Sequence, residues 1–362
     1  MLEDRKIKTL TVIVPSYNME DYLPRNLGGM VVDPALMERL EVLVVNDGSK
    51  DRTSEVAHGF ADRWPGTFRV IDKENGNYGS CVNRGLAEAM GFYVKVLDAD
   101  DYVDTAAFAD YLSVLDEEAA KGDAAVDLVV ADYAKVDPDG HVLARSRFGL
   151  REGISTLADR PADSDWMAVQ AVTYRTENLR RIGYRQTEGC SYTDNEWAAE
   201  PLSTVRRLRY VPRLVTQYLV GRAGQTMEDA TFARNFGQVV RVAENLASRY
   251  DRRLREAVPE AREHYRREVL GLIGVCYTHI LFGYGTHRVC ADVAAFDDSL
   301  RRHEALYRDS ESLSIRIGRH LEFHHVREWR RKRSSRTAKL ILYGIYKRLN
   351  VLRHALVGRL GR

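Results

Sequence analysis

The hydrophobic pattern of the first hundred residues alternates short apolar runs with amphipathic stretches. The runs predict strands over residues 10–15, 40–46, 68–72 and 93–97. The stretches between them predict helices from about Glu20, over 52–63 with Asp51 as N-cap, and over 79–90. Apolar strands separated by helices are typical of βαβ units, whose sheet is covered on both faces. We therefore predict an α/β fold, with a Rossmann-like mixed or parallel sheet between helices.

The pattern changes twice further along the chain. A helix is expected from Asp104 to about Lys121 and a strand over 126–133, and residues 137–140 have the composition of a hairpin turn. Residues 150–226 are mixed, with strand-like runs at 208–211 and 215–220. Helical periodicity dominates afterwards, over 232–249, 262–281 and 292–306. We predict a first domain over 1–226, a helical appendage over 227–326 and a separate tail over 327–362.

Composition narrows the class of protein. The 362 residues are 44% hydrophobic and 29% charged, which is ordinary for a globular protein and excludes disordered, collagen-like and membrane-embedded classes for most of the chain. The four cysteines are far apart and show no zinc-ligand spacing, so we expect reduced thiols in a cytosolic protein. The first apolar run is too short for the core of a signal peptide.

The ends of the four predicted strands are unusually polar. Ligands of open α/β sheets bind at the carboxyl ends of the strands. We therefore expect one composite site, built from Pro15-Ser16-Tyr17-Asn18, Asn46-Asp47-Gly48-Ser49, Asn75-Gly76 and Asp98-Ala99-Asp100-Asp101.

The last of these turns holds three carboxylates in four residues. Such carboxylates repel one another unless a cation or hydrogen-bond donors compensate them. Oxygen ligands of this kind suit Mg²⁺ or Mn²⁺. The alternative is a solvated acidic turn in which Asp101 or Asp104 caps the next helix.

The four turns, in this order and spacing, resemble family 2 glycosyltransferases of the GT-A fold, over roughly residues 8–226. The resemblance implies a GT-A domain, followed here by a C-terminal helical extension, that uses a nucleotide-sugar donor, most often a UDP-sugar, and Mn²⁺ or Mg²⁺. The usual aspartate pair before Gly-Ser is Asn46-Asp47 here. The resemblance implies that Pro15, Tyr17 and Asp47 bind the nucleobase. It implies that Asp98 contacts the ribose or the donor sugar and that Asp100 binds the metal. Further donor contacts are implied for Asn18, Asn75 and Gly76.

Further residues carry weaker predictions. Asn75-Gly76 could equally be a plain turn before a helix, and Arg84 could reach a phosphate or form a salt bridge on a helix surface. Arg222 and Gln225 lie in a segment that resembles the one closing over the diphosphate in non-processive members. The Gln-x-x-Arg-Trp motif of processive synthases is absent, which favours addition of a single sugar.

An inverting displacement needs a carboxylate that takes the proton of the acceptor hydroxyl. The resemblance places this base at Asp194, in a segment that opens a helix, with Glu196 as the rival. The alternative is that Thr193 or Asp194 is only the N-cap, with Glu196 supporting the first turn.

The tail is strongly basic. Residues 327–362 contain 12 Lys and Arg against one acid, which leaves a net charge of −9 on the rest of the chain. Apolar residues at helical spacing predict an amphipathic helix on an anionic membrane surface. Packing against the body or a partner subunit is the alternative, and RNA is disfavoured because no RNA-recognition motif accompanies the charge. The apolar positions are Ile341, Ile345, Leu349, Leu352, Leu356 and Leu360.

Together these features predict a metal-dependent inverting glycosyltransferase that adds one sugar to a hydroxyl of a lipid-linked or cell-surface glycan. We expect it in the cytoplasm, peripheral on the inner face of the membrane, and leave open whether it forms a homo-oligomer. The alternatives are a sugar-nucleotide nucleotidyltransferase and a non-catalytic, membrane-associated scaffold that binds sugar nucleotides. Donor hydrolysis in the presence of Mn²⁺ distinguishes an enzyme from a scaffold.

Overall fold

The computed structural model describes most of the chain, which divides into two units. The first comprises Met1–Ala223 with Ala257–Tyr265, and the second Gly224–Glu256 with Arg266–Arg362. Each unit is treated by itself below. The described residues are 8–161, 164–222, 225, 228–284, 287–289, 291–317, 321–334, 338–347 and 349.

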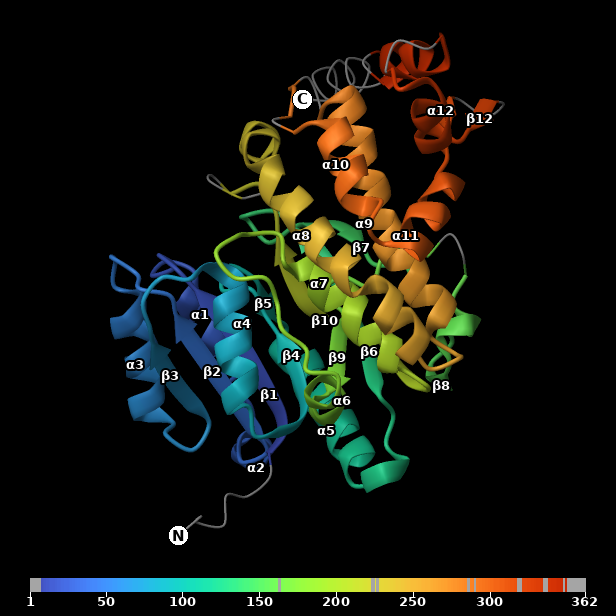
Figure 1. Ribbon diagram of the computed structural model, residues 1–362. Coiled ribbons are helices and arrows are strands. Elements are labelled where there is room, and N and C mark those ends of the chain that lie inside the picture. Colours follow the sequence, from blue (N-terminus) through green and yellow to red (C-terminus); the bar gives the residue numbers. More distant parts are fainter. Residues whose placement is uncertain are drawn as a thin grey trace. The chain divides into compact units, whose positions relative to one another are not determined.

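The first unit is built on a ten-stranded sheet (Figure 1). Its first half is parallel: β3, β2, β1 and β4 lie side by side in this order, so their carboxyl ends share one edge. The four strands predicted from the apolar runs are thus confirmed. Their bounds are Lys8–Ser16 (β1), Leu40–Asn46 (β2), Phe68–Asp72 (β3) and Gly91–Val96 (β4).

The second half of the sheet is mixed. The short strand β9 (Val172–Arg175) runs antiparallel to both β4 and β6 (Leu128–Val136), and β10 (Leu208–Leu219) runs parallel to β6. The two predicted runs at 208–211 and 215–220 are one strand, with register shifts between Val211 and Thr216, so the prediction of two strands was wrong. The remaining strands are β5 (Tyr102–Val103), β7 (Val142–Arg145) and β8 (Gly153–Ser155), all antiparallel to their neighbours.

Helices cover both faces of the parallel half, as predicted. Because successive side chains of a strand point to opposite faces, Ile13 packs in one core with Val82 of α4, while Val12 packs in the other with Phe108 of α5. The helices of this unit are α1 (Leu23–Gly29), α2 (Pro34–Met37), α3 (Thr53–Arg63), α4 (Asn77–Glu88), α5 (Thr105–Ala119), α6 (Thr176–Arg181) and α7 (Asp194–Ala199).

Two helix starts differ in detail from the prediction. α3 begins at Thr53 with Arg52 at the N-cap position, so Asp51 lies one residue earlier than expected. Its carboxylate still accepts hydrogen bonds from the Thr53 N–H (3.0 Å) and hydroxyl (2.6 Å). Asp104, rather than Asp101, caps α5, through the Ala107 N–H at 2.9 Å. This leaves Asp101 available for another role.

The second unit is mainly helical. Asp292 caps α10 through the Ala295 N–H, and the predicted helix over 292–306 is in fact two helices. The elements are α8 (Asp229–Glu256), α9 (Arg262–Phe282, with its first four residues in the first unit), α10 (Val293–Leu300), α11 (Glu304–Asp309), β11 (Ile315–Ile317), β12 (Leu321–Phe323) and α12 (His325–Lys332).

A buried carboxylate fixes α12 within the second unit. Asp297 is 0% exposed and accepts hydrogen bonds from the Arg330 Nε (2.6 Å), the Arg333 guanidinium (3.1 Å) and the hydroxyls of Tyr277 (2.7 Å) and Tyr307 (3.3 Å). The start of the basic tail therefore packs on the body, which is the alternative to a membrane-bound helix for this part of the chain.

The next helical segment, residues 338–347, has two different faces. Leu340 is 1% exposed, and Tyr343 packs against Phe282. Ile341 and Ile345, in contrast, are 48% and 52% exposed. The predicted positions Leu352, Leu356 and Leu360 lie outside the described residues. Within the described parts of the chain, no helix is both long and apolar enough to cross a membrane.

Candidate active site

The turn after β1 is joined to the turn after β2 through Asn18. Its side-chain oxygen accepts the Lys50 N–H (2.8 Å), and its own N–H donates to the Ser49 hydroxyl (3.0 Å). Asn18 adopts a positive φ of 53°, which asparagine tolerates better than most residues. Tyr17 beside it is 45% exposed, which leaves its ring free to stack on a flat ligand. Pro15, the residue before the end of β1, is in register with Val45 of β2.

Asp47, at the end of β2, is 3% exposed and holds the start of α4. Its carboxylate accepts the N–H groups of Gly76 (2.9 Å) and Asn77 (2.8 Å) and pairs with the Lys73 ammonium. Asn75 donates to the Asp47 carbonyl at 2.9 Å. A carboxylate at a helix N-terminus satisfies N–H groups that have no partner within the helix. This role was not predicted, and the contact of Asp47 with a nucleobase stays a prediction.

Two carboxylates after β4, those of the half-buried Asp98 and the buried Asp101, are tied to several elements. Asp98 accepts the Tyr78 hydroxyl at 2.7 Å, and Asp101, which is 1% exposed, accepts the Leu219 N–H at 2.9 Å. The Gln170 amide lies 3.5 Å from Asp98 and 3.3 Å from Asp101. Asp101 therefore joins this turn to β10, while Asp98 remains at the strand-end edge.

Burial and mutual repulsion disturb the ionisation of this cluster. Burial, followed by the charge of Asp100, raises the pKa of Asp98 to about 7. Burial also raises the pKa of Asp101 well above its ordinary value, and Asp98 and Asp100 add to the effect. The negative charge here exceeds what the surrounding donors compensate.

Lys95 is a member of the cluster that the sequence analysis missed. It is 2% exposed, its ammonium donates to the Gln170 carbonyl at 2.6 Å, and burial lowers its pKa to about 7 against the opposing charges of Asp101 and Asp98. The sequence feature that could have identified Lys95 is that it is a charged residue inside the apolar run over 93–97.

Asp100 is held by Arg222, whose Nε lies 2.6 Å from the carboxylate. The guanidinium also sits 5.3 Å from the ring centre of Tyr22. The structure thus brings together two predicted site residues that are 122 positions apart. Gln225 belongs to the second unit, where its carbonyl accepts the Glu228 N–H.

Asp194 is the first residue of α7 and follows Tyr192, which has a φ of 67°. Its carboxylate reaches solvent, yet enough protein surrounds it to raise its pKa through desolvation. Desolvation first, and then the charges of Asp98 and Asp194, raise the pKa of the half-buried Tyr78. Thr193 makes no side-chain cap and donates to Gln186 at 2.9 Å instead, so the structure does not realise the capping alternative for Thr193.

Two residues with weaker predictions occupy structural positions. Glu196 is 0% exposed and accepts the Thr187 N–H (2.6 Å) and hydroxyl (2.9 Å). Arg84 forms an exposed salt bridge with Glu88 one helical turn away, at 2.6 Å. These contacts favour Asp194 over Glu196 as the base and match the salt-bridge alternative for Arg84.

Gly79 connects the two sides of the site. A Cβ atom at this position would lie 2.1 Å from the Thr187 carbonyl oxygen, so α4 presses directly on the segment that leads to α7. Because Thr187 is bonded to Glu196, the position of Asp194 depends on this close approach.

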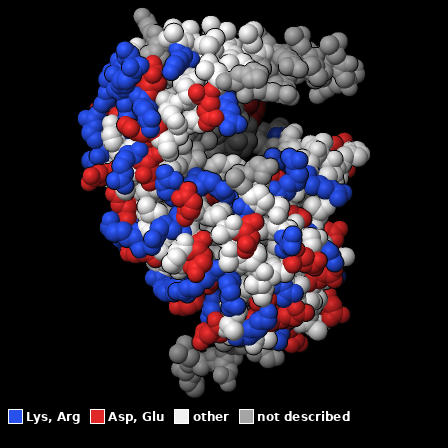
Figure 2. All heavy atoms as spheres, turned by 90° about the vertical axis from the view of Figure 1, so that its right-hand side faces the viewer, with Lys and Arg blue, Asp and Glu red and all other residues white. Residues whose placement is uncertain are grey.

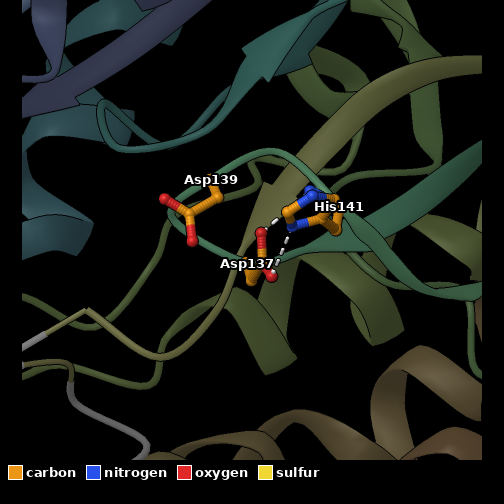
Figure 3. Close-up of side chains that lie close together, drawn as sticks. All are labelled: Asp137, Asp139 and His141. Atoms are coloured by element: carbon orange, nitrogen blue, oxygen red, sulfur yellow. Dashed lines mark hydrogen bonds and ion pairs between the residues drawn. The ribbon is translucent and has the colours of Figure 1, made fainter.

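The donor atoms suit a hard divalent cation. Asp98 and Asp100 supply carboxylate oxygens, and the raised pKa of Asp98 shows negative charge that a cation would neutralise. A second acidic group, Asp137, Asp139 and His141, lies at the tip of the β6–β7 hairpin (Figure 3). It is largely exposed, and Asp137 already accepts the His141 N–H at 2.8 Å. These contacts stabilise the predicted hairpin.

The sheet order and the acidic strand ends are those expected of a GT-A fold. Residues 11–157 match the model of "Glycosyl transferase family 2", so the chain carries a family 2 glycosyltransferase domain. The uncharacterized glycosyltransferase EpsJ of Bacillus subtilis is 33% identical over 133 residues, which are 37% of this chain and 36% of EpsJ. The minor teichoic acid biosynthesis protein GgaB of the same organism is 33% identical over 107 residues, 30% of this chain and 12% of GgaB.

A solved structure shares the fold. S. aureus TarS, residues 1–349, in complex with UDP-GlcNAc, superimposes with a TM-score of 0.58 at 20% identity and covers 82% of this chain and 83% of that one. The predicted GT-A fold is confirmed. The matched segments span about a third or less of the EpsJ and GgaB chains.

Proposed function

We propose that this protein transfers one sugar from a nucleotide-sugar, a UDP-sugar in the first instance, to an acceptor hydroxyl, with inversion and with Mn²⁺ or Mg²⁺. The observation that carries the proposal is the convergence of the strand-end acids and Asp194. All four carboxylates, those of Asp98, Asp100, Asp101 and Asp194, lie close enough to Tyr218 to raise the pKa of its hydroxyl beyond the effect of burial.

The donor binds at the edge formed by the parallel strands. Tyr17 offers an exposed ring for stacking on the base, and the Asn75–Gly76 turn lets the nucleotide approach backbone. A uridine nucleotide is supported by TarS, which has been solved with UDP-GlcNAc. Asp98 and Asp100 hold the cation, and Arg222 moves from Asp100 to the diphosphate. When bound, the cation stabilises negative charge on the leaving diphosphate.

Asp194 performs the proton transfer. Its carboxylate takes the proton of the acceptor hydroxyl while that oxygen forms its bond to the anomeric carbon and the bond from this carbon to the diphosphate oxygen breaks. Attack opposite the leaving group inverts the configuration. A raised pKa strengthens Asp194 as a base, provided that the pH keeps it ionised.

The acceptor is a lipid-linked or cell-surface glycan, reached from the cytoplasmic face of the membrane. Support comes from GgaB, named as a teichoic acid biosynthesis protein, and from the exposed apolar side chains of Ile341, Leu342, Ile345 and Leu349. Figure 2 shows Lys and Arg gathered densely in one area of the face it presents. Exposed apolar side chains on a segment that also carries the exposed Lys339 favour an anionic membrane surface.

Thermal shift against a panel of nucleotide-sugars tests the donor site, because ligands that bind only the folded state raise Tm. We expect a UDP-sugar with Mn²⁺ to raise Tm more than either component alone. Product analysis with the bound donor then distinguishes transfer from the alternatives. Release of pyrophosphate would indicate a nucleotidyltransferase, and binding without any turnover would indicate a scaffold.

Vesicle sedimentation tests the membrane contact separately. Replacing Ile341 and Ile345 by Glu should release the protein from vesicles that contain phosphatidylglycerol. The matched control replaces Ala294 and Ala295, which are exposed on α10 of the same unit, by Glu, so that the same charge is added outside residues 338–347. Unchanged sedimentation of the Ile variant would contradict the membrane contact and leave the donor-site proposal intact.

A further inference from the structure

A cavity of about 480 Å³ opens on the first unit, and Asp98, Asp100 and Asp101 are not among its lining residues. Its floor is buried and mostly apolar, with Leu86, Leu179 and Tyr184 at 6%, 0% and 4% exposure. Its walls come from α4, from α6 and from the segment that follows α6. No predicted function uses this cavity.

The rim of the cavity is basic. Lys73, Arg84, Arg180 and Arg185 line it, against a single acid, Glu188. Glu188 is already bonded to Arg185 (3.0 Å) and to the Asn83 amide (2.8 Å). Arg84 pairs with Glu88 and Lys73 pairs with Asp47, so the uncompensated positive charge of the rim lies at Arg180 and favours an anionic ligand.

Arg180 is the clearest anion ligand of the four. Its guanidinium donates to the Ala89 carbonyl at 2.6 Å, and among the residues that the structure describes it pairs with no carboxylate. Arginine presents several N–H groups in a planar fork that matches phosphate oxygens. A cavity of this volume also holds more than a bare phosphate.

The cavity touches both halves of the proposed active site. Lys73, on its rim, pairs with Asp47, which holds the start of α4. On the opposite wall, Asn83 exchanges hydrogen bonds with the backbone of Gln186 at 2.8 and 2.9 Å, and the Gln186 side chain accepts from Thr193, next to Asp194. A ligand here contacts residues that position donor and base.

We propose that this cavity binds a phosphate ester with a small organic group. The phosphate lies between Arg180 and Arg185, and the organic group covers Leu86 and Leu179. This site is separate from the donor site and does not depend on the proposed transfer.

Isothermal titration with glycerol 3-phosphate, inorganic phosphate and glycerol tests the proposal. We expect saturable binding of glycerol 3-phosphate, weaker binding of inorganic phosphate and none of glycerol. Replacing Arg180 and Arg185 by Ala should weaken glycerol 3-phosphate binding at least tenfold while the Kd for UDP with Mn²⁺ stays within twofold.

The control variant replaces Arg181 and Arg213 by Ala. Arg181 is the neighbour of Arg180 on α6 but bonds to Asn178, and Arg213 lies on β10, so the same charge is removed outside the cavity. Equal weakening in both variants, or no saturable binding by the unmodified protein, would overturn the proposal. Failure of UDP to bind would contradict the proposed function instead and leave this site standing.

Discussion

Asp297 in the second unit and the three acids after β4 in the first unit are compensated differently. Asp297 in the second unit receives two guanidinium groups and two tyrosine hydroxyls. In the first unit, Asp98, Asp100 and Asp101 share one lysine and one arginine. A buried carboxylate with enough hydrogen-bond donors stabilises the fold. A carboxylate without enough donors favours binding a cation or a proton. The comparison separates a structural carboxylate from reactive ones within a single chain.

The largest expected effect is at the base. Replacing Asp194 by Asn should lower kcat about a hundred- to ten-thousand-fold, because the amide cannot accept the acceptor proton. Donor binding, measured by titration with UDP and Mn²⁺, should remain. The exposed Asp139 on the hairpin, replaced by Asn, provides the control and should leave kcat unchanged. Normal turnover of the Asp194 variant would show that Asp194 is not the base.

The structural carboxylate can be tested by removing its main partner. Replacing Arg330 by Met should lower the free energy of unfolding by about 3–5 kcal/mol, because it leaves Asp297 buried with an incomplete set of partners. Arg331, the next residue, is 64% exposed and, among the described residues, pairs with Glu328 one turn away, so Arg331→Met should cost less than about 1 kcal/mol. Urea denaturation measures both. Equal losses would contradict the structural role of Asp297.

The raised pKa of Asp98 should make the free energy of unfolding depend on pH. The pKa of Asp98 is raised from 3.8 to about 7, so between these pH values the folded protein binds a proton that the unfolded chain lacks. Its contribution therefore lowers stability as pH rises from about 4 to 7. Without added metal, raising the pH from 5 to 7.5 should destabilise the unmodified protein by about 1–3 kcal/mol more than an Asp98→Asn variant. Parallel pH curves for the two proteins would refute this.

A smaller change comes from the hydroxyl beside Asp98. The Tyr78 hydrogen bond lowers the pKa of Asp98, so Tyr78→Phe should raise it further. We expect the acid limb of Mn²⁺ binding to move upward by about one to two pH units at most, because one hydrogen bond to a charged group contributes about 1.5–3 kcal/mol and about 1.4 kcal/mol corresponds to one pH unit. Tyr343→Phe in the second unit is the control. A downward shift would mean that the hydroxyl does not stabilise the ionised form.

The sequence predicted the parts of the site that depend on local pattern. Apolar runs located the four parallel strands, and the polar residues directly after them, such as Asp47 and Asp98, fell at the sheet edge as expected. The partners of those residues were harder to predict. Arg222 reaches Asp100 only because β10 ends beside the turn after β4, and Gln170 enters through the segment before β9, a four-residue strand with no clear periodicity.

Lys95 shows the same limit in a single residue. Its place in an apolar run is visible in the sequence, but its meaning depends on the carbonyl of Gln170, 75 positions away. Arg330 in the second unit is a similar case. The basic composition around it predicted an exposed side chain, but the ion pair with Asp297 keeps this side chain largely buried.

The close contact at Gly79 restricts which residues this position can accept, in evolution and in engineering. The space between Gly79 and the Thr187 carbonyl oxygen does not admit a methyl group. Any side chain at position 79 would therefore push the segment that leads to Asp194 away from α4. Engineering that aims to broaden the range of sugars should therefore leave Gly79 and Thr187 unchanged. Substitutions at solvent-exposed positions of the active site need not alter the distance between leaving group and nucleophile.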